Sequence, residues 1–382
     1  MAVISMSTNK KKKFKLKPGI VKILKVIGIV LIVILILFIF YRSNINALKK
    51  IGYSEKASKN IVFKFKKKEV INLGKNKTLN KAFESDDYIE KNFTSYSKIK
   101  YQNQENIIKN INKLLKIGYS NDEISLILSR GTDKDVSDFA KREKVKYLEE
   151  FFSVSYSKLK NYDRYVSYMD ISREDEETSV LYVNLDLDKD NYNNPKKVNE
   201  FSYTMLVNKH HVLDKKFVPQ NLKTVSTEYA SDKGVKANNT AIAQAKKMID
   251  AAKKEDKNII INSAYRSYED QEEVVNTYQE LYGDEYIEKY VLKPGFSEHQ
   301  TGLGIDFGST DTKIFIQSDE YKWMEENCYK YGFIHRFKSS YEDITGIKSE
   351  AWHYRYVGKK AAKYMYENDM SLEEYYIKFI EK

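Results

Sequence analysis

One long apolar stretch dominates the N-terminal part of the chain. Residues 26–40 form an uncharged run, with further apolar residues on both sides. A helix rises about 1.5 Å per residue, so some twenty residues cross a hydrocarbon core of roughly 30 Å. Lys22 and Lys25 can extend their ammonium groups to the interface. The pattern therefore predicts a transmembrane helix over residues 20–41.

The charges around this run predict its orientation. Residues 1–25 carry eight lysines and no acidic residue, whereas few basic residues follow the run closely. Because cytoplasmic flanks are enriched in Lys and Arg, we expect residues 1–19 to be a cytoplasmic tail and everything after residue 42 to be extracytoplasmic. A cleaved signal peptide is the alternative, but its apolar region spans about 7–15 residues and ends at a small-residue site. The sequence after Phe40 lacks such a site.

Residues 43–178 contain a weak internal repeat with helical periodicity. The segment 48–54 recurs at 114–120, and both copies end in Ile-Gly-Tyr-Ser. Gly118 is placed to end one helix, and Ser120 can cap the next together with Glu123. The repeat predicts duplicated helical hairpins, which we interpret as a spacer or interaction module whose protein partner the sequence does not identify.

The pattern changes after residue 178. Residues 179–187 alternate like a strand and residues 188–197 form a polar loop, so we predict a linking strand and loop over 179–200. In residues 201–382, short apolar runs and amphipathic segments follow one another without the regular alternation of a doubly wound parallel sheet. We predict an α+β domain with a mostly antiparallel sheet.

Composition narrows the functional classes. The net charge of +11 by itself suggests nucleic-acid binding. However, eight of these positive charges lie in residues 1–25, so the rest of the chain has little excess charge. A nucleic-acid-binding domain keeps its positive charge on the folded part, so no nucleic-acid partner is expected. Cys328 is the single cysteine, which excludes an intrachain disulfide and indicates stability from ordinary apolar cores.

The histidines indicate where the chemistry lies. His299 and Asp306 are seven residues apart, so a straight strand would point them to opposite faces, but Gly302 and Gly304 allow a bend. His353 would supply a third ligand from a distant segment. Two imidazoles and one carboxylate with an open fourth position are typical of a catalytic zinc site, whereas structural sites close with four ligands that are commonly cysteines.

Glu350 precedes His353 by three residues, so both can face the same metal site on a tight turn. A carboxylate there would take a proton from water and deliver it to the leaving amine. The spacing alone leaves the alternative that His299 and His353 are ordinary buried imidazoles and Glu350 is a surface acid.

The other aromatic candidates are weaker. His210 and His211 are adjacent, so they point in different directions on a strand, and we interpret them as loop or surface residues. His335 lies in an aromatic, strand-like segment and is interpreted as a core or rim histidine. The 31 tyrosines are interpreted as packing and surface residues rather than as a stacking platform.

Four motifs in this order resemble those of the VanY-type D-alanyl-D-alanine carboxypeptidases, which are zinc peptidases of bacterial cell-wall metabolism. They are the sequence Ser-Ala-Tyr-Arg-Ser at 263–267, the segment 297–306 with its Ser, His and Asp, Trp323 with the Tyr-Gly-Phe at 331–333, and Glu-Ala-Trp-His-Tyr-Arg at 350–355. The resemblance covers roughly residues 201–382, and its motifs are jointly specific.

The resemblance implies a role for each residue that matches a motif. Its implied site comprises His299, Asp306 and His353 as ligands of one Zn2+ ion, Glu350 as general base and acid, Arg266 as stabiliser of the oxyanion, and Ser263, Gln271 and Ser297 as substrate contacts. Gly304 replaces the usual alanine, Ala351 a common proline and Ala264 a glycine, and none of these departures removes a functional group.

The implied activity is removal of the C-terminal D-alanine from peptidoglycan stem peptides at the bacterial cell membrane. Zinc, Asp306, Glu350 and Arg266 together carry an excess of about one positive charge, which a free C-terminal carboxylate would neutralise. Two alternatives stay open: an L,D-carboxypeptidase that acts on tetrapeptide stems, and a non-catalytic wall-binding protein.

Overall fold

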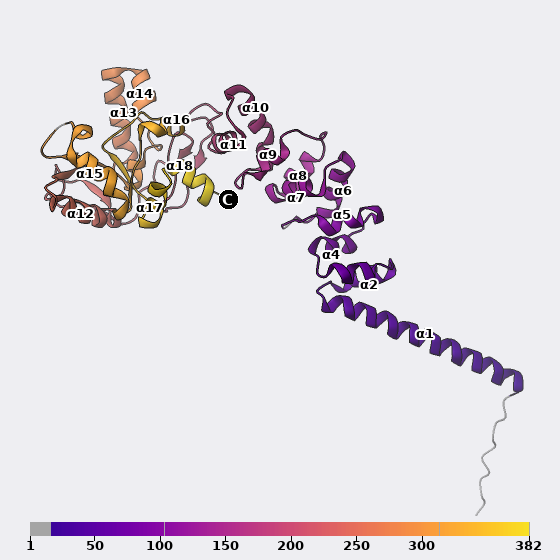
Figure 1. Ribbon diagram of the computed structural model, residues 1–382. Coiled ribbons are helices and arrows are strands. Elements are labelled where there is room, and N and C mark those ends of the chain that lie inside the picture. The colour runs from indigo at the N-terminus through magenta and orange to yellow at the C-terminus, as the bar shows by residue number, and fades with distance from the viewer. Residues whose placement is uncertain (1–16, 103, 313, 382) are drawn as a thin grey trace, which may run out of the picture. The chain divides into compact units, whose positions relative to one another are not determined.

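The computed structural model describes residues 17–102, 104–312 and 314–381 (Figure 1). It divides into two compact units, Met1–Lys146 and Tyr147–Lys382. Within its described residues, the first unit contains only helices: α1 (Pro18–Lys50), α2 (Glu55–Phe63), α3 (Lys67–Leu73), α4 (Lys77–Glu84), the 3-10 helix η1 (Glu90–Asn92), α5 (Phe93–Lys98), α6 (Ile107–Ile117), α7 (Asn121–Arg130) and α8 (Asp133–Phe139).

Helix α1 contains the whole predicted span 20–41. It has 33 residues, and by length and composition it could cross a membrane. Its apolar side chains are exposed from Ile20 to Tyr41, and the helix becomes buried only near its C-terminal end, at Asn44, Ile45 and Leu48. Residues 1–16, most of the predicted basic tail, lie outside the described residues.

The repeat seen in the sequence has a structural counterpart. Gly52 ends α1 and Gly118 ends α6, both with positive φ, at 102° and 104°. The serine two residues later caps the following helix in each copy, through its hydroxyl oxygen and the N–H of Ala57 or Glu123. A glycine at this position ends a helix without the steric cost of a Cβ, so the predicted helical hairpins are confirmed.

The same arrangement of polar side chains occurs once within each unit. In the first, the Asn92 amide and the Tyr96 hydroxyl both donate to Oδ1 of Asn112, at 2.8 and 2.5 Å. In the second, Asn161 and Tyr165 donate to Oδ1 of Asn184 in the same way, at 2.9 and 2.8 Å. We call each set of three side chains an amide latch. The acceptor of the first latch lies on α6, so its counterpart is expected on a helix.

The predicted strand over 179–187 is accordingly wrong. Residues 176–184 form α11 (Glu176–Asn184), and the Asp175 side chain caps it by accepting the N–H of Thr178. Val180, Val183 and Asn184 are buried on a common helical face, where packing and the second latch outweigh the strand propensity of the local sequence. Because α11 belongs to the C-terminal unit, the compact units do not divide near residue 200.

The C-terminal unit combines helices with three small sheets. Its helices are α9 (Leu148–Ser153), α10 (Tyr162–Ser172), α11, α12 (Asn239–Lys253), α13 (Tyr268–Tyr282), α14 (Asp284–Tyr290), α15 (Asp319–Asn327), α16 (Glu342–Thr345), α17 (Lys359–Glu367) and α18 (Leu372–Tyr375). Two short sheets pair β1 (Lys196–Lys197) with β2 (His211–Val212) and β3 (Leu222–Thr224) with β4 (Lys236–Asn238).

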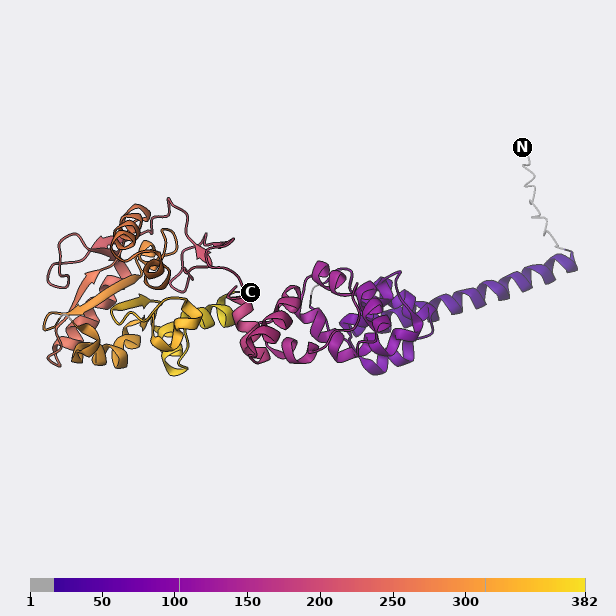
Figure 2. The same cartoon turned by 90° about the horizontal axis from the view of Figure 1, so that it is seen from above.

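The main sheet has four strands, and every pairing in it is antiparallel, as predicted. Its order is β5 (Ile259–Ser263), β6 (Gly304–Ser309), β8 (His353–Tyr356) and β7 (Phe333–His335). These strands lie side by side, coloured orange to yellow, in Figure 2.

Alternation along β6 and β8 separates a core face from a polar face. Ile305, Phe307, Tyr354 and Tyr356 belong to one buried cluster with apolar residues of α12 and α15. Successive side chains in a strand point to opposite faces, so Asp306 and His353 point away from that cluster. They are directly opposite each other in the register of the two strands, which brings a carboxylate and an imidazole together on the polar face.

Candidate metal centre

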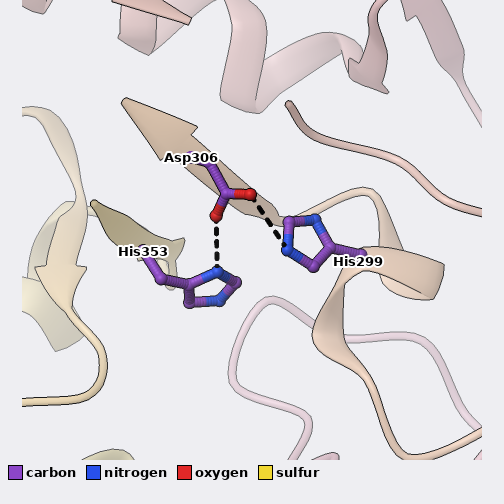
Figure 3. Close-up of side chains that lie close together, drawn as sticks. All are labelled: His299, Asp306 and His353. Atoms are coloured by element: carbon purple, nitrogen blue, oxygen red, sulfur yellow. Dashed lines mark hydrogen bonds and ion pairs between the residues drawn. The ribbon is translucent and has the colours of Figure 1, made fainter. Parts of the chain in front are cut away.

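Three donor side chains meet on the polar face of the sheet. The donor atoms of His299, Asp306 and His353 all lie within 4.8 Å of one another. Oδ1 of Asp306 is 2.9 Å from Nδ1 of His353, and Oδ2 is 3.4 Å from Nε2 of His299. Figure 3 shows the carboxylate between the two imidazole rings.

A bend after η3 (Glu298–Thr301) brings His299 to the strand that carries Asp306. Gly302 ends this turn with φ at 67°, in the left-handed region that glycine adopts without a Cβ penalty. Gly304 lies close to His353, because a Cβ there would be 2.9 Å from Cε1 of the ring. The two glycines thus permit the bend that their positions in the sequence predict, and Gly304 leaves room for the His353 ring on β8.

Contacts on the far side of each ring orient it toward the shared centre. Nδ1 of His299 faces the carbonyl of Ala264, which leaves Nε2 directed at Asp306. Nε2 of His353 is 3.4 Å from Oε2 of Glu298, which leaves Nδ1 directed inward. Hydrogen bonds of this kind select the tautomer and ring orientation of a metal-binding histidine, so these donors suit a metal such as zinc.

Glu298 is held in turn by a completely buried group of charges. Its Oε1 is 2.8 Å from Nε of Arg336 and 2.8 Å from Nη1 of Arg355. Arg336 also contacts Glu373, at 2.6 Å. All four side chains have zero exposed surface, and their formal charges cancel. We refer to Glu298, Arg336, Arg355 and Glu373 as the buried charge cluster.

The ionisation of the centre follows from burial and these contacts. Burial opposes charge on Glu298, but Arg336 and Arg355 hold the pKa of its carboxyl well below the usual range. Burial also opposes charge on His353, yet its contacts with Asp306 and Glu298 raise the pKa of the imidazole to about 9. The arrangement therefore favours a positive charge beside Asp306, which a cation can provide in place of a proton.

Glu350 and Arg266 border the same cavity of about 240 Å³ as the three donors. Burial raises the pKa of Glu350 to about 7, although His353 opposes this shift. Nε of Arg266 is buried without a hydrogen-bond partner among the described residues. A carboxylate that exchanges a proton near neutral pH and an uncommitted guanidinium N–H are thus close to the candidate metal centre.

The residues implied as substrate contacts divide into two groups. Gln271 and Ser297 line the cavity, and the Ser297 hydroxyl accepts the N–H of His299 at 3.4 Å. Ser263 lies at the end of β5, opposite Asp306 in the strand register, and it is not among the lining residues of that cavity in the described structure.

The other histidines have different surroundings. His335 is buried and stacked on Tyr354, with Nδ1 3.0 Å from Glu325, so its interpretation as a core histidine is confirmed. His210 lies in a turn and His211 on β2, and they are 4% and 2% exposed. Their interpretation as surface residues is therefore wrong, whereas the loop position holds for His210. The His211 ring contacts the ring of Tyr376 near the C-terminus, with the ring centroids 5.5 Å apart.

Two features of the site were missed in the sequence. Glu298 was visible beside His299, but only the structure reveals its contact with His353. Tyr278, Tyr286 and Tyr290 line the cavity and contact one another and Tyr282 through their rings, a local cluster that the general interpretation of the tyrosines as packing and surface residues did not single out. Their spacing of four residues on helical segments was the available signal.

Comparison with known proteins places this arrangement in a family. Residues 234–359 match the family model VanY, D-alanyl-D-alanine carboxypeptidase. Over 178 residues the chain is 32% identical to the bifunctional D-Ala-D-Ala dipeptidase and D-Ala-D-Ala carboxypeptidase VanXYC of Enterococcus gallinarum, covering 45% of this chain and 92% of that protein. The chain belongs to the VanY-type carboxypeptidase family.

Further relatives show how far the similarity extends. YodJ of Bacillus subtilis is 39% identical over 181 residues, which are 45% of this chain and 66% of YodJ. The chain spans between 39% and 66% of the length of three of the curated relatives it matches. Among solved structures, that of the LdcB LD-carboxypeptidase is 36% identical and covers 48% of this chain and 89% of LdcB, with a TM-score of 0.44.

Proposed function

We propose that this protein is a zinc-dependent D,D-carboxypeptidase that removes the C-terminal D-alanine from peptidoglycan stem peptides. The observation that carries the proposal is the meeting of His299, Asp306 and His353 in one cavity with Glu350 and Arg266. Membership of the VanY-type family supports the same activity, as do the names of relatives that act on D-Ala-D-Ala.

In this proposal, His299, Asp306 and His353 hold one zinc ion. A bound zinc ion polarises a carbonyl oxygen and lowers the pKa of water. Glu350 accepts a proton from the attacking water and gives it to the leaving amine, a role that suits a carboxyl with a pKa of about 7. The Arg266 guanidinium donates hydrogen bonds to the oxygen on which negative charge develops.

The proposal also places the protein at the bacterial cell membrane. Helix α1 would be its single anchor, with the N-terminus in the cytoplasm and the carboxypeptidase domain outside, and the length and apolar surface of α1 support this. Protease added to intact cells should cut residues 43–382 and leave the N-terminal tail protected. Release of the protein into the medium without α1 would instead indicate a cleaved signal peptide.

Glu350→Gln tests the catalytic assignment. The amide is close in size to the carboxylate but cannot accept the proton, so zinc content should persist while D-alanine release falls at least about 100-fold. Glu367→Gln, an exposed change on α17, is the matched control. Full activity of Glu350→Gln would rule out the assigned base.

Product masses decide the specificity. The purified protein is incubated with pentapeptide and tetrapeptide stems, and loss of D-alanine from the pentapeptide alone is expected. Loss from the tetrapeptide would indicate an L,D-carboxypeptidase instead. Lack of chelator-sensitive hydrolysis of either peptide would indicate a non-catalytic wall-binding protein.

A further inference from the structure

Helices α13 and α14 carry a continuous stack of tyrosines beside the catalytic cavity. We define the tyrosine ladder as Tyr278, Tyr282, Tyr286 and Tyr290. Tyr286 lies centrally, with ring centroids 5.9 Å from Tyr278, 4.6 Å from Tyr282 and 4.7 Å from Tyr290. The two helices lie side by side at one edge of the C-terminal unit (Figure 1).

The ladder connects the cavity to solvent. Tyr278, Tyr286 and Tyr290 line the cavity that contains the three metal-ligating candidates. Tyr282 continues the stack outward and is 59% exposed. Helix α13 buries only Gln271, so packing against the protein interior does not explain why its aromatic residues lie on this side.

The rings of the tyrosine ladder lie against one another rather than against a cation of the described residues. Lysines lie over several other tyrosines of this unit, for example Lys215 over Tyr268 at 4.9 Å and Lys293 over Tyr192 at 4.2 Å. Within the described ranges, no lysine or arginine is recorded over a ring of the ladder. The face of an aromatic ring attracts a cation within about 6 Å of its centroid. The rings of the ladder partly cover one another, but Tyr278, Tyr282 and Tyr290 remain 38%, 59% and 40% exposed, so the outer part of the stack is accessible to a cationic ligand.

Charge in the same hairpin favours a cationic occupant. Residues 268–288 contain eight acidic residues and no lysine or arginine. Some of these acids are paired, as Glu285 is with Lys289 and Glu288 with Lys209. The remainder give the hairpin a negative field, although the chain as a whole has a net charge of +11.

Gln271 supplies a separate indication that a ligand binds here. Its side chain is 3% exposed and lines the cavity. Nε2 donates to the carbonyl of Leu292 at 2.7 Å, but Oε1 has no hydrogen-bond partner within the described part of the chain. A buried acceptor without a donor costs free energy, and an N–H group of a ligand in the cavity would satisfy it.

We infer that the tyrosine ladder binds an ammonium-bearing side chain of the peptide substrate, on the N-terminal side of the bond that is cut. This inference rests on the proposed carboxypeptidase function, because the terminal carboxylate then lies near Arg266 and the rest of the peptide must leave the cavity. The protein should distinguish peptides with a free side-chain amine from those in which that amine is acylated.

Two peptides test this directly: Nα-acetyl-Lys-D-Ala-D-Ala, and the same peptide with an additional acetyl group on the side-chain amine. Their dissociation constants are measured by calorimetry with the full-length protein after treatment with chelator, and kcat/KM is measured with the zinc-loaded protein. A cation over an aromatic face contributes about 0.5–2 kcal/mol, so the free amine should bind roughly 2–30-fold more tightly. The preference should shrink at high salt, because screening weakens the field of the hairpin.

Variants identify the ring face as the cause. Tyr290 lines the cavity at the end of the stack and is 40% exposed. Tyr290→Leu should reduce the preference to about one, whereas Tyr290→Phe should keep it, because the ring remains and only the hydroxyl is lost. Tyr364→Leu, a partly exposed tyrosine on α17, is the matched control and should keep the preference.

Equal affinity for the two peptides, or binding of neither, would overturn the inference. A preserved preference in Tyr290→Leu would also overturn it. The proposed function fails by a different result, namely the absence of D-alanine release from both peptides while the difference in binding affinity persists.

Discussion

Replacing Glu298 by Gln tests how the candidate metal centre is held in place. The change keeps the size of the side chain but removes the negative charge that contacts His353, Arg336 and Arg355. It therefore affects two things at once: the contact that directs Nδ1 of His353 toward the centre, and the charge balance of the buried charge cluster.

The structure supports a magnitude for each effect. Loss of an outer contact to a metal-binding histidine typically lowers metal affinity by about 10–100-fold, or roughly 1.4–2.8 kcal/mol. The cluster would also retain two buried arginines and a single carboxylate. Removing one partner of a buried ion pair costs about 3–5 kcal/mol, so we expect both weaker zinc binding and a lower free energy of unfolding.

Glu373→Gln separates the two effects. It removes the same charge from the same cluster and loses contacts to Arg336, but Glu373 has no recorded contact with His353 in the described structure. Both variants should lower the midpoint of chemical denaturation of the metal-free protein, whereas only Glu298→Gln should weaken zinc binding substantially. The zinc dissociation constant is measured by competition with a chromophoric chelator.

The two measurements together can refute the reasoning. If Glu298→Gln binds zinc within about twofold of the unchanged protein, Glu298 does not orient His353. If both variants weaken zinc binding equally, the effect comes from charge or stability rather than from the contact with His353.

Three further results are expected. Chelator treatment should lower the thermal unfolding midpoint, because a metal that binds only the folded state stabilises it, and His299→Ala should abolish this difference. Gly302→Ala should destabilise the protein more than Gly234→Ala in chemical denaturation. Both glycines have positive φ, but only at Gly302 would a Cβ come within 2.9 Å of a side-chain atom of Leu222. Equal losses of unfolding free energy in the two variants would contradict this. Burial lowers the pKa of His211 from 6.5 to about 4, so the unfolded chain takes up a proton first as the pH falls. The His211 contribution to stability is then present above pH 6.5 and declines by about 2 kcal/mol by pH 5. His211→Gln should reduce the fall in unfolding free energy between pH 7.5 and 5. An unchanged fall would show that His211 is not the group responsible.

The sequence identifies the three donor side chains that meet in the structure, because metal-binding chemistry restricts the residue types. Few side chains bind zinc, the chain has five histidines, and two of them lie in motifs with acids at defined distances. The antiparallel sheet could also be predicted, since strand-like and helical segments do not alternate as a parallel sheet requires.

The errors arise where tertiary contacts decide. The alternation over 179–187 is typical of a strand, but Asn184 lies on α11, where it completes an amide latch with Asn161 and Tyr165. The buried charge cluster joins Glu298 to Glu373, 75 positions later in the chain, through Arg336. No local pattern predicts that pairing, because each residue alone is typical of a solvated surface.

The amide latches have a consequence for tracing the history of the helical region. Each relies on two asparagines and one tyrosine, with the outer asparagines 20 residues apart in the first copy and 23 in the second. Other positions in the two copies can diverge while these three side chains preserve the local backbone. Searches for further copies in distant chains should therefore weigh this triplet and its spacing above overall identity, since duplication followed by drift would erase most other traces of common ancestry.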